Sequence, residues 1–479
     1  MSAPRTDLVV RSRRVVLPDG EREAAVVVRA GRIAAIVPRA ESPAADETVD
    51  CGDACLMPGL VDTHVHVNEP GRAEWEGFAT ATRAAAAGGV TTLVDMPLNS
   101  IPATTTVAAL AAKRAAAAAA GCRVDCGFWA GVVPGNTAEL EGLAAAGVLG
   151  FKCFLVPSGV DEFACVGERD LRAAMPVLAR LGLPLLAHAE LPGPIAAAAS
   201  ALQGRDPRRY ATWLVSRPPA AEVEAVQLLL RLCEETGCAV HIVHLAAAEA
   251  LADLRAARAR GLAVTVETCP HHLVFTAEEI EDGDTLLKCA PPIRERENRE
   301  RLWEALGEGA IDLVATDHSP CPPALKRLDS GDFVAAWGGI ASLEVTLSAV
   351  WTEARARGLT PSDLARWMAE APARLAGFAG RKGVIAPGAD ADLVVWDPDA
   401  EWTVSGARLH QRHPLTPYDG RRLAGVVRAT FVRGVRVYAR GDAAGEFPGA
   451  PAGELLSRAR ADGSARHTGR AVDRGGASR

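Results

Sequence analysis

Eight short apolar runs, separated by stretches with helical periodicity, constrain the fold of this chain more than any other feature. Each run is continuous in apolar residues rather than alternating, as expected for parallel strands that are buried on both faces. Helical stretches between the runs end at glycines, for example Gly88, Gly237 and Gly261. The alternation predicts an α/β fold, a (β/α)8 barrel of the TIM type with insertions. The eight runs are residues 60–66, 91–96, 125–132, 150–155, 184–190, 239–245, 263–269 and 312–317.

The main alternative for alternating strands and helices is an open, doubly wound sheet. Such a sheet carries a glycine-rich phosphate-binding turn after its first strand. The residues that follow the first run here are Val67, Asn68, Glu69 and Pro70, which form no such turn. The sequence therefore favours the closed barrel.

Strand-like segments also lie at both ends of the chain. Residues 7–57 contain short apolar runs separated by turn signals, and similar runs return after residue 383. We expect the two ends to pack together as one small β-sandwich module. The expected organisation is residues 1–57 and 383–447 in this module and residues 58–382 in the barrel. Residues 448–479, rich in Ala, Gly, Arg and Ser, are expected to be a weakly ordered tail.

The composition argues against several classes of partner. A net charge of −7 over 479 residues offers no attraction for nucleic acid or an anionic membrane. No apolar run approaches the roughly 18 residues needed to cross a bilayer. The 11 cysteines are scattered without a zinc-knuckle spacing, and the first residues lack the pattern of a secretory signal. We therefore expect a reduced, cytoplasmic protein with no nucleic-acid or membrane partner.

Metal-ligand residue types lie at the carboxyl ends of the predicted barrel strands. His64 and His66 are two residues apart in the first strand, so their side chains point to the same face. His188, His244 and Asp317 close the fifth, sixth and eighth strands. Each of these alone fits a structural residue equally well, but all five meet at the mouth where barrel enzymes build their sites. Together they predict a site for zinc, or for cobalt, nickel, manganese or iron.

Lys152 lies inside the fourth apolar run, between Phe151 and Cys153. Burial disfavours an ammonium ion, so a lysine there tends to lose its proton. A neutral amine adds carbon dioxide to form a carbamate, which is a carboxylate that can bridge two cations. The alternative is a lysine whose ammonium reaches solvent. The neighbouring ligand set favours carboxylated Lys152 (N6-carboxylysine) between two divalent metal ions.

These residues, and several longer segments, resemble the cyclic amidohydrolases, a family that includes dihydroorotases, hydantoinases (dihydropyrimidinases) and allantoinases. The resemblance runs from around residue 5 to residue 445. Within this range, the local sequence is most similar to the sequences of the allantoinases. The segments that carry this similarity are PGLVDTHVHVNEPGRAEWEGF (58–78), DMPLNSIPATT (95–105), GFKCFLVPSGVDEF (150–163), ETCPHHL (267–273), LKCAPPIR (287–294), ATDHSPC (315–321) and AWGGIASLE (336–344).

Two positions separate the sister families. Dihydroorotases carry an arginine two residues after the second histidine, where it pairs with a substrate carboxylate, but this chain has Asn68. Hydantoinases carry a tyrosine five residues after the bridging lysine, where this chain has Pro157. The resemblance thus implies hydrolytic opening of allantoin to allantoate, a step of purine (ureide) catabolism. A hydantoinase-like hydrolase of another cyclic amide and a non-catalytic metal-binding barrel are the alternatives.

The resemblance also divides the ligands between two metal ions. His64 and His66 are expected to hold the more buried ion, and His188 and His244 the more exposed one. Carboxylated Lys152 is expected to bridge the pair. A hydroxide between the ions is then expected to attack the ring amide carbonyl.

Asp317 is implied as a further ligand of the first ion and as the catalytic residue, which takes a proton and returns it to the leaving nitrogen.

Asn99 follows the second strand, where it fits either a contact with the ureido arm or a turn. The expected partners are a small cyclic ureide and, by resemblance, further copies of the chain in a homotetramer. Other expected substrate-binding positions are Cys289, for which a buried core thiol is the alternative, and Ser319, Gly338 and Gly339.

Several other histidines are expected to support the site without binding metal. His241 and His318 are an odd number of residues from a ligand on the same strand, so they point to the opposite face. His271 and His272 follow the seventh strand and are assigned no metal. Asp62 shares a strand face with His64 and is expected to support it.

Overall fold

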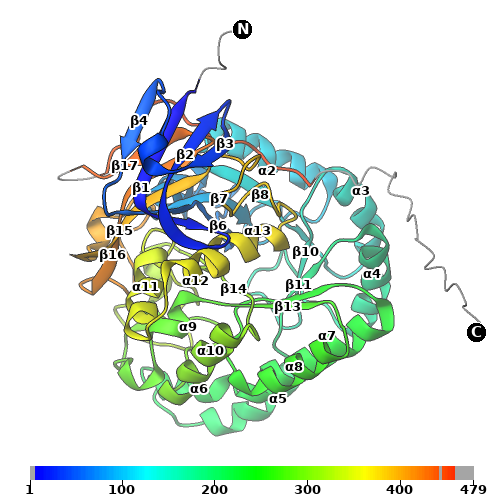
Figure 1. The fold of residues 1–479 in the computed structure, drawn as a ribbon. Coiled ribbons are helices and arrows are strands. Elements are labelled where there is room, and N and C mark those ends of the chain that lie inside the picture. The colour runs from blue at the N-terminus through cyan, green and yellow to red at the C-terminus, as the bar shows by residue number, and fades with distance from the viewer. Residues whose placement is uncertain (1–5, 442–444, 459–479) are drawn as a thin grey trace, which may run out of the picture.

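A computed structural model of the chain describes residues 6–441 and 445–458 (Figure 1). Its centre is a ring of parallel strands. The first three strands form one parallel sheet: β6 (Leu60–Val65), β7 (Val90–Asp95) and β8 (Asp125–Phe128). A second sheet continues in chain order with β9 (Ala130–Gly131), β10 (Phe151–Phe154), β11 (Leu185–His188), β12 (Val240–Ile242), β13 (Val264–Thr268) and β14 (Leu313–Val314).

The two sheets close into a barrel. β8 and β9 lie in one continuous segment, which pairs with β7 on one edge and with β10 on the other. At the remaining gap, Val65 forms a parallel bridge with His318. The backbone amide of His66 also donates to the His318 carbonyl at 2.8 Å. β8 and β9 therefore occupy one barrel position, and the predicted (β/α)8 barrel is confirmed.

Helices cover the outside of the barrel. α2 (Val107–Ala120) illustrates why they begin and end where they do: the Thr106 side chain accepts from the Ala109 amide at its start, and Gly121 ends it with φ of +66°. No helix among the described residues is long and apolar enough to cross a membrane. The other helices are α1 (Phe78–Ala87), α3 (Leu140–Ala145), α4 (Glu168–Leu181), α5 (Pro192–Ala198), α6 (Tyr210–Ser216), α7 (Pro219–Thr236), α8 (Leu251–Ala259), α9 (Pro270–Val274), α10 (Arg296–Glu308), α11 (Thr346–Ala356), α12 (Pro361–Ala365) and α13 (Ala371–Leu375).

Strands from both ends of the chain assemble into one eight-stranded mixed sheet, blue and orange in Figure 1. β5 (Cys55–Pro58) joins the two halves, because it pairs in parallel with β1 and antiparallel with β15. Only Gly59 separates β5 from the first barrel strand. The other strands are β1 (Leu8–Leu17), β2 (Gly20–Arg29), β3 (Arg32–Val37), β4 (Glu47–Asp50), β15 (Leu393–Thr403), β16 (Arg422–Val432) and β17 (Val435–Ala439).

A buried ion cluster ties this sheet to the barrel. The Lys382 ammonium, fully buried, donates to Asp125 of β8 at 2.7 Å and to Asp392, next to β15, at 2.6 Å. Arg433, which follows β16, donates to the same Asp125 carboxylate at 2.5 and 2.6 Å. The charges are mutually compensated, which makes their burial tolerable.

The predicted start of a weakly ordered tail at residue 448 is wrong. Leu455 forms a parallel bridge with Cys126, and Leu456 is buried in the barrel core. The Glu454 amide also donates to the Asp125 carboxylate at 2.8 Å. The segment is held by these two leucines and by the edge of β8 that faces away from β7, and average composition reveals neither contact. The rest of the predicted tail, residues 459–479, lies outside the described residues.

Candidate active site

A pocket with a volume of about 260 Å³ lies at the carboxyl ends of the barrel strands. Five of the six predicted metal ligands line it, and Lys152 lies buried among them. The structure therefore brings together residues that are far apart in the chain. The lining includes His64, His66, His188, His244 and Asp317, and also the predicted substrate-binding positions Asn99, Cys289, Ser319, Gly338 and Gly339.

The two histidines of the first strand and Asp317 converge on one point. The Nε2 atoms of His64 and His66 each lie 3.2 Å from Oδ1 of Asp317. Asp317 follows β14 with φ of +46°, a left-handed conformation that is uncommon outside glycine and clusters at functional sites. Burial alone raises the pKa of Asp317, but the charges of His64 and His66 outweigh it and hold the pKa well below its usual range. Asp317 is therefore a carboxylate at neutral pH.

His188 and His244 form the other half of the site. Nδ1 of His188 lies 3.0 Å from Nε2 of His244. The other ring nitrogen of His188 lies 2.7 Å from Oε2 of Glu190, which favours a proton on that nitrogen and a lone pair on Nδ1. Burial lowers the pKa of both imidazoles, that of His244 well below its usual value. Both rings are therefore neutral, the form in which imidazole binds metal.

Lys152 lies on β10, fully buried, and its Nζ atom has no hydrogen-bond partner among the described residues. Burial lowers the pKa of Lys152 to about 8, although Glu267 and Asp317 oppose the shift. An unpaired ammonium in the interior is unfavourable. The Lys152 charge adds to burial in lowering the pKa values of His66, His188 and His244, so the amine stands within the electrostatic reach of both histidine pairs.

Glu267 on β13 is a site residue that the sequence analysis missed. One carboxylate oxygen contacts Nδ1 of His64, and the other lies 3.0 Å from Nε2 of His241. Burial raises the pKa of Glu267, but His64 and His241 outweigh it and bring the value to about 2. The carboxylate thus orients His64 so that Nε2 faces the pocket. The sequence feature that could have identified Glu267 is its position as a charged residue inside the apolar run at residues 263–269.

Glu190 and Arg217 form a second pair that was missed. Nη1 of Arg217 donates to Glu190 at 2.5 Å, on the same oxygen that contacts His188. Arg217 is the only arginine among the described residues that line the pocket. The spacing His188-x-Glu190 places both side chains on one strand face, as in His64-x-His66. This spacing is the sequence feature that could have identified Glu190 as a site residue.

The loop that carries Gly338 and Gly339 is held over the pocket by two buried lysines. Lys288 donates to the carbonyl of Val334 at 3.0 Å and also to that of Ala336. Lys326 donates to the carbonyls of Trp337, at 3.3 Å, and Gly339. A Cβ atom at Gly339 would lie 2.2 Å from the Ser319 carbonyl oxygen, so glycine is required for this close approach.

Asn99 and the two family-discriminating positions differ in their access to the pocket. Asn99 lines it, has φ of +64°, and its Oδ1 atom is buried without a hydrogen-bond partner in the described parts of the chain, so it can accept from a ligand. Pro157 also lines the pocket. Asn68 is buried and donates to the Pro320 carbonyl at 3.4 Å instead. The pocket wall therefore has a proline where hydantoinases are expected to carry a phenol, whereas Asn68, at the position of the arginine expected in dihydroorotases, does not line the pocket.

Comparisons with known proteins place the chain in a family. The amidohydrolase family model matches residues 55–437. The allantoinase of Streptomyces avermitilis is 51% identical, with 94% of this chain and 99% of that protein covered. The allantoinase of Arabidopsis thaliana is 44% identical, with 92% and 90% covered. The chain therefore belongs to the amidohydrolase family.

Solved structures give the same class of enzyme. The L-hydantoinase (dihydropyrimidinase) from Arthrobacter aurescens superposes with a TM-score of 0.90 at 32% identity, covering 95% of this chain and all of that one. A dihydropyrimidinase from Brevibacillus agri gives a TM-score of 0.84 at 28% identity, covering 94% and 98%. The fold, the site and these relatives define the chain as a cyclic amide hydrolase.

Proposed function

We propose that this enzyme is an allantoinase, which hydrolyses the hydantoin ring of allantoin to allantoate in purine catabolism. The proposal rests on the difference in sequence identity between this chain and two sets of relatives. Proteins named as allantoinases are 43–51% identical over most of their lengths, whereas the hydantoinases with solved structures are 27–32% identical. Asn68 and Pro157 support the same choice, since each replaces a residue expected in a sister family.

The proposed metal centre holds two divalent ions, most simply zinc, with cobalt, nickel, manganese or iron as alternatives. The donor set supports this. His64 and His66 present their Nε2 atoms toward Asp317, and His188 and His244 present neutral nitrogens toward each other. The donor atoms of His64, His244 and Asp317 also lie within 4.8 Å of one another, so the two histidine pairs face one compact site.

Lys152 is the proposed bridge between the two ions, as its carbamate with carbon dioxide. Its Nζ atom is buried, unpaired and easily deprotonated, which suits addition of carbon dioxide. The carbamate would replace an uncompensated cation with an anion among four imidazoles. When bound, the two ions supply an activated water molecule and a polarised substrate carbonyl.

Asp317 is the proposed proton carrier. Its carboxylate stands at the pocket wall and is ionised, so it offers an acceptor for the proton of the attacking water. The same oxygen can then deliver that proton to the ring nitrogen as the amide bond breaks. One residue can serve both steps because it takes up and then releases the same proton.

The substrate-binding proposal rests on neutral polar groups. Allantoin carries no carboxylate, so it needs hydrogen bonds rather than a charged partner. The Asn99 side chain, with its unpaired oxygen, is proposed to contact the ureido arm. Backbone groups are proposed to contact the ring at Cys289, Ser319, Gly338 and Gly339, which all line the pocket.

We also propose that the enzyme is cytoplasmic and assembles as a homotetramer, as its resemblance to cyclic amidohydrolases implies. All 11 cysteines are free thiols, which fits a reducing compartment. The division into a barrel at residues 58–382 and a β module from both ends is likewise proposed.

The direct test measures allantoate formed from allantoin by protein stripped with a chelator and then reloaded with zinc and bicarbonate. We expect the stripped protein to be inactive and the reloaded protein to be active. Equal allantoate formation before and after stripping would contradict the proposed metal centre.

A further inference from the structure

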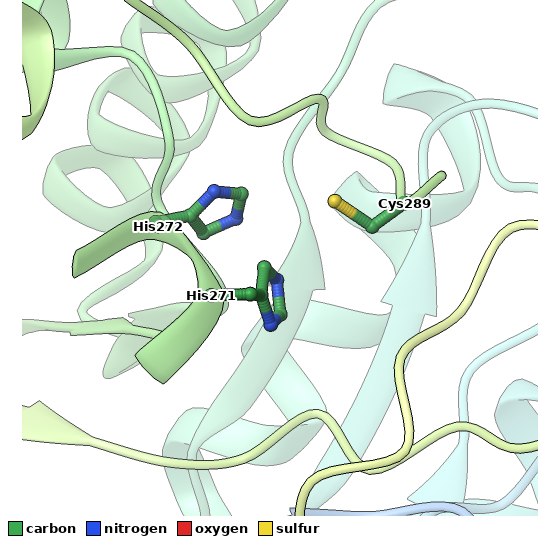
Figure 2. A group of neighbouring side chains, drawn as sticks. All are labelled: His271, His272 and Cys289. Carbon is green, nitrogen blue, oxygen red and sulfur yellow. The ribbon is translucent and has the colours of Figure 1, made fainter. Parts of the chain in front are cut away.

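A second group of potential metal ligands lies outside the proposed catalytic metal centre, although the backbone of one member, Cys289, is among the proposed substrate contacts. His271 and His272 lie on α9, and Cys289 lies on the loop that follows a short 3₁₀ turn (Thr285–Leu287). One donor atom from each residue lies within 4.8 Å of those of the other two. Figure 2 shows the Cys289 sulfur pointing toward the two imidazole rings. All three side chains are buried, with 1%, 3% and 2% of their surface exposed.

Three of the four ring nitrogens of the two histidines lack hydrogen-bond partners within the described structure. Both ring nitrogens of His272, and Nδ1 of His271, are buried without a hydrogen bond among the described residues. Buried polar atoms in native proteins are almost always paired, so such a group calls for an explanation. The rings also lie against each other, with centroids 4.3 Å apart. A shared ligand would satisfy the unpaired nitrogens that face it, and the thiol as well.

The neutral state of the two imidazoles suits a cation as that ligand. Burial lowers the pKa of His271 to about 4 and that of His272 well below its usual value, so both imidazoles are neutral. Burial raises the pKa of the Cys289 thiol, which donates to the Pro291 carbonyl at 3.2 Å. A bound metal ion would displace this thiol proton and gain a thiolate ligand.

We propose that His271, His272 and Cys289 form a binding site for a thiophilic divalent cation of the zinc class, separate from the catalytic metal centre. Two imidazoles and one thiolate are a zinc-type set, with bonds of about 2.0 Å to nitrogen and about 2.3 Å to sulfur. These bonds place donor atoms about 3.5 Å apart, which small side-chain rotations can reach from the present spacing. Cys289 lines the substrate pocket, so a water molecule from the pocket can complete the four ligands.

Occupation of this site is expected to inhibit the enzyme. The Cys289 carbonyl accepts from Nε1 of Trp213 at 3.0 Å, and both residues line the pocket. An ion that draws the Cys289 sulfur toward α9 would displace this part of the wall. The inhibition rests on the proposed function, but the binding does not.

Titration of the metal-loaded enzyme with Cd²⁺ tests the binding. The proposed catalytic ligands include no thiol, so a thiolate-to-cadmium absorption band reports cysteine sites alone. Cys233 is a buried thiol on α7 that does not line the pocket, which makes Cys233→Ser a matched control. We expect the wild type and Cys233→Ser to develop the band with one additional Cd²⁺ bound.

The Cys289→Ser variant is expected to lose the band, and His272→Gln is expected to bind the additional Cd²⁺ at least about tenfold more weakly. If Cys289→Ser fails to fold, His272→Gln and His271→Gln carry the test. Absence of the band in the wild type, or an undiminished band in Cys289→Ser, would overturn the proposal. The band is read without substrate, so the result stands whether or not the enzyme hydrolyses allantoin.

Discussion

The Nδ1 atom of His188 lies 3.0 Å from the Nε2 atom of His244, at the ends of neighbouring barrel strands. Glu190 favours the proton of His188 on the opposite ring nitrogen. Two nitrogens at this distance repel each other unless a proton or a cation lies between them. Burial holds both rings neutral, so either the single proton of His244 on Nε2 or a metal ion lies between the two nitrogens, and the proposed metal centre corresponds to the second arrangement.

The His244→Asn variant should therefore lose one of the two metal ions. We expect allantoin hydrolysis to fall by more than about 100-fold, beyond the range typical of residues that only support a ligand. Metal content by elemental analysis and the rate of allantoate formation check this. His413→Asn, at a histidine that does not line the pocket, should keep both ions and a normal rate. A His244→Asn protein with two ions and full activity would remove this residue from the metal centre.

Lys152→Ala should lose most of its metal and its activity, because no carbamate can form. Lys152→Arg should fail in the same way, since a guanidinium keeps its charge and does not add carbon dioxide. A short carboxylic acid such as propionate should restore part of the activity of Lys152→Ala by filling the space with a carboxylate. Full metal content and activity in Lys152→Arg would rule out the bridge.

Asp317→Asn should retain much of its metal, held by the histidines, and lose turnover by about 10²- to 10⁴-fold, the range of general acid–base catalysis. Asp312→Asn is the control at the other end of the same strand, where Asp312 accepts from the Val266 amide at 2.7 Å. That variant should hydrolyse allantoin at nearly the normal rate. Equal rates for the two variants would show that Asp317 carries no proton.

Lys382→Met should destabilise the fold, because it leaves Asp125 and Asp392 with too little compensating charge in the interior. Removal of one partner of a buried ion pair costs about 3–5 kcal/mol in the free energy of unfolding. Arg180→Met breaks an exposed pair with Glu141 and should cost no more than about 1 kcal/mol. Urea denaturation measures both. A cost for Lys382→Met no larger than the control would show that the cluster does not hold the sheet to the barrel.

Much of the fold, and the gathering of the candidate ligands at one mouth, could be predicted from the sequence, because both follow from local patterns. Continuous apolar runs identify parallel strands buried on both faces, and strand parity places His64 and His66 together. The carboxyl ends of such strands meet at one mouth, which brings Asp317 to the same place. These inferences do not depend on contacts between loops that are distant in the chain.

The residues that were missed act through neighbours distant in the chain. Glu267 and Arg217 acquire their roles only when β13 meets His64 and when the segment before α7 meets Glu190. Lys288 and Lys326 bind loop carbonyls, and no sequence pattern marks which carbonyls lie within reach. The same reason applies to Leu456, whose burial depends on pairing with the edge of β8 that faces away from β7.

The central claim is tested most directly by the initial rates of the zinc-loaded, bicarbonate-supplied enzyme with allantoin, hydantoin, dihydrouracil and dihydroorotate, each under the same conditions. We predict that kcat/KM for allantoin exceeds that for every other substrate by orders of magnitude, with allantoate as the product. A higher value for hydantoin or dihydrouracil, with allantoin inert, would contradict the assignment while leaving a cyclic amide hydrolase in place.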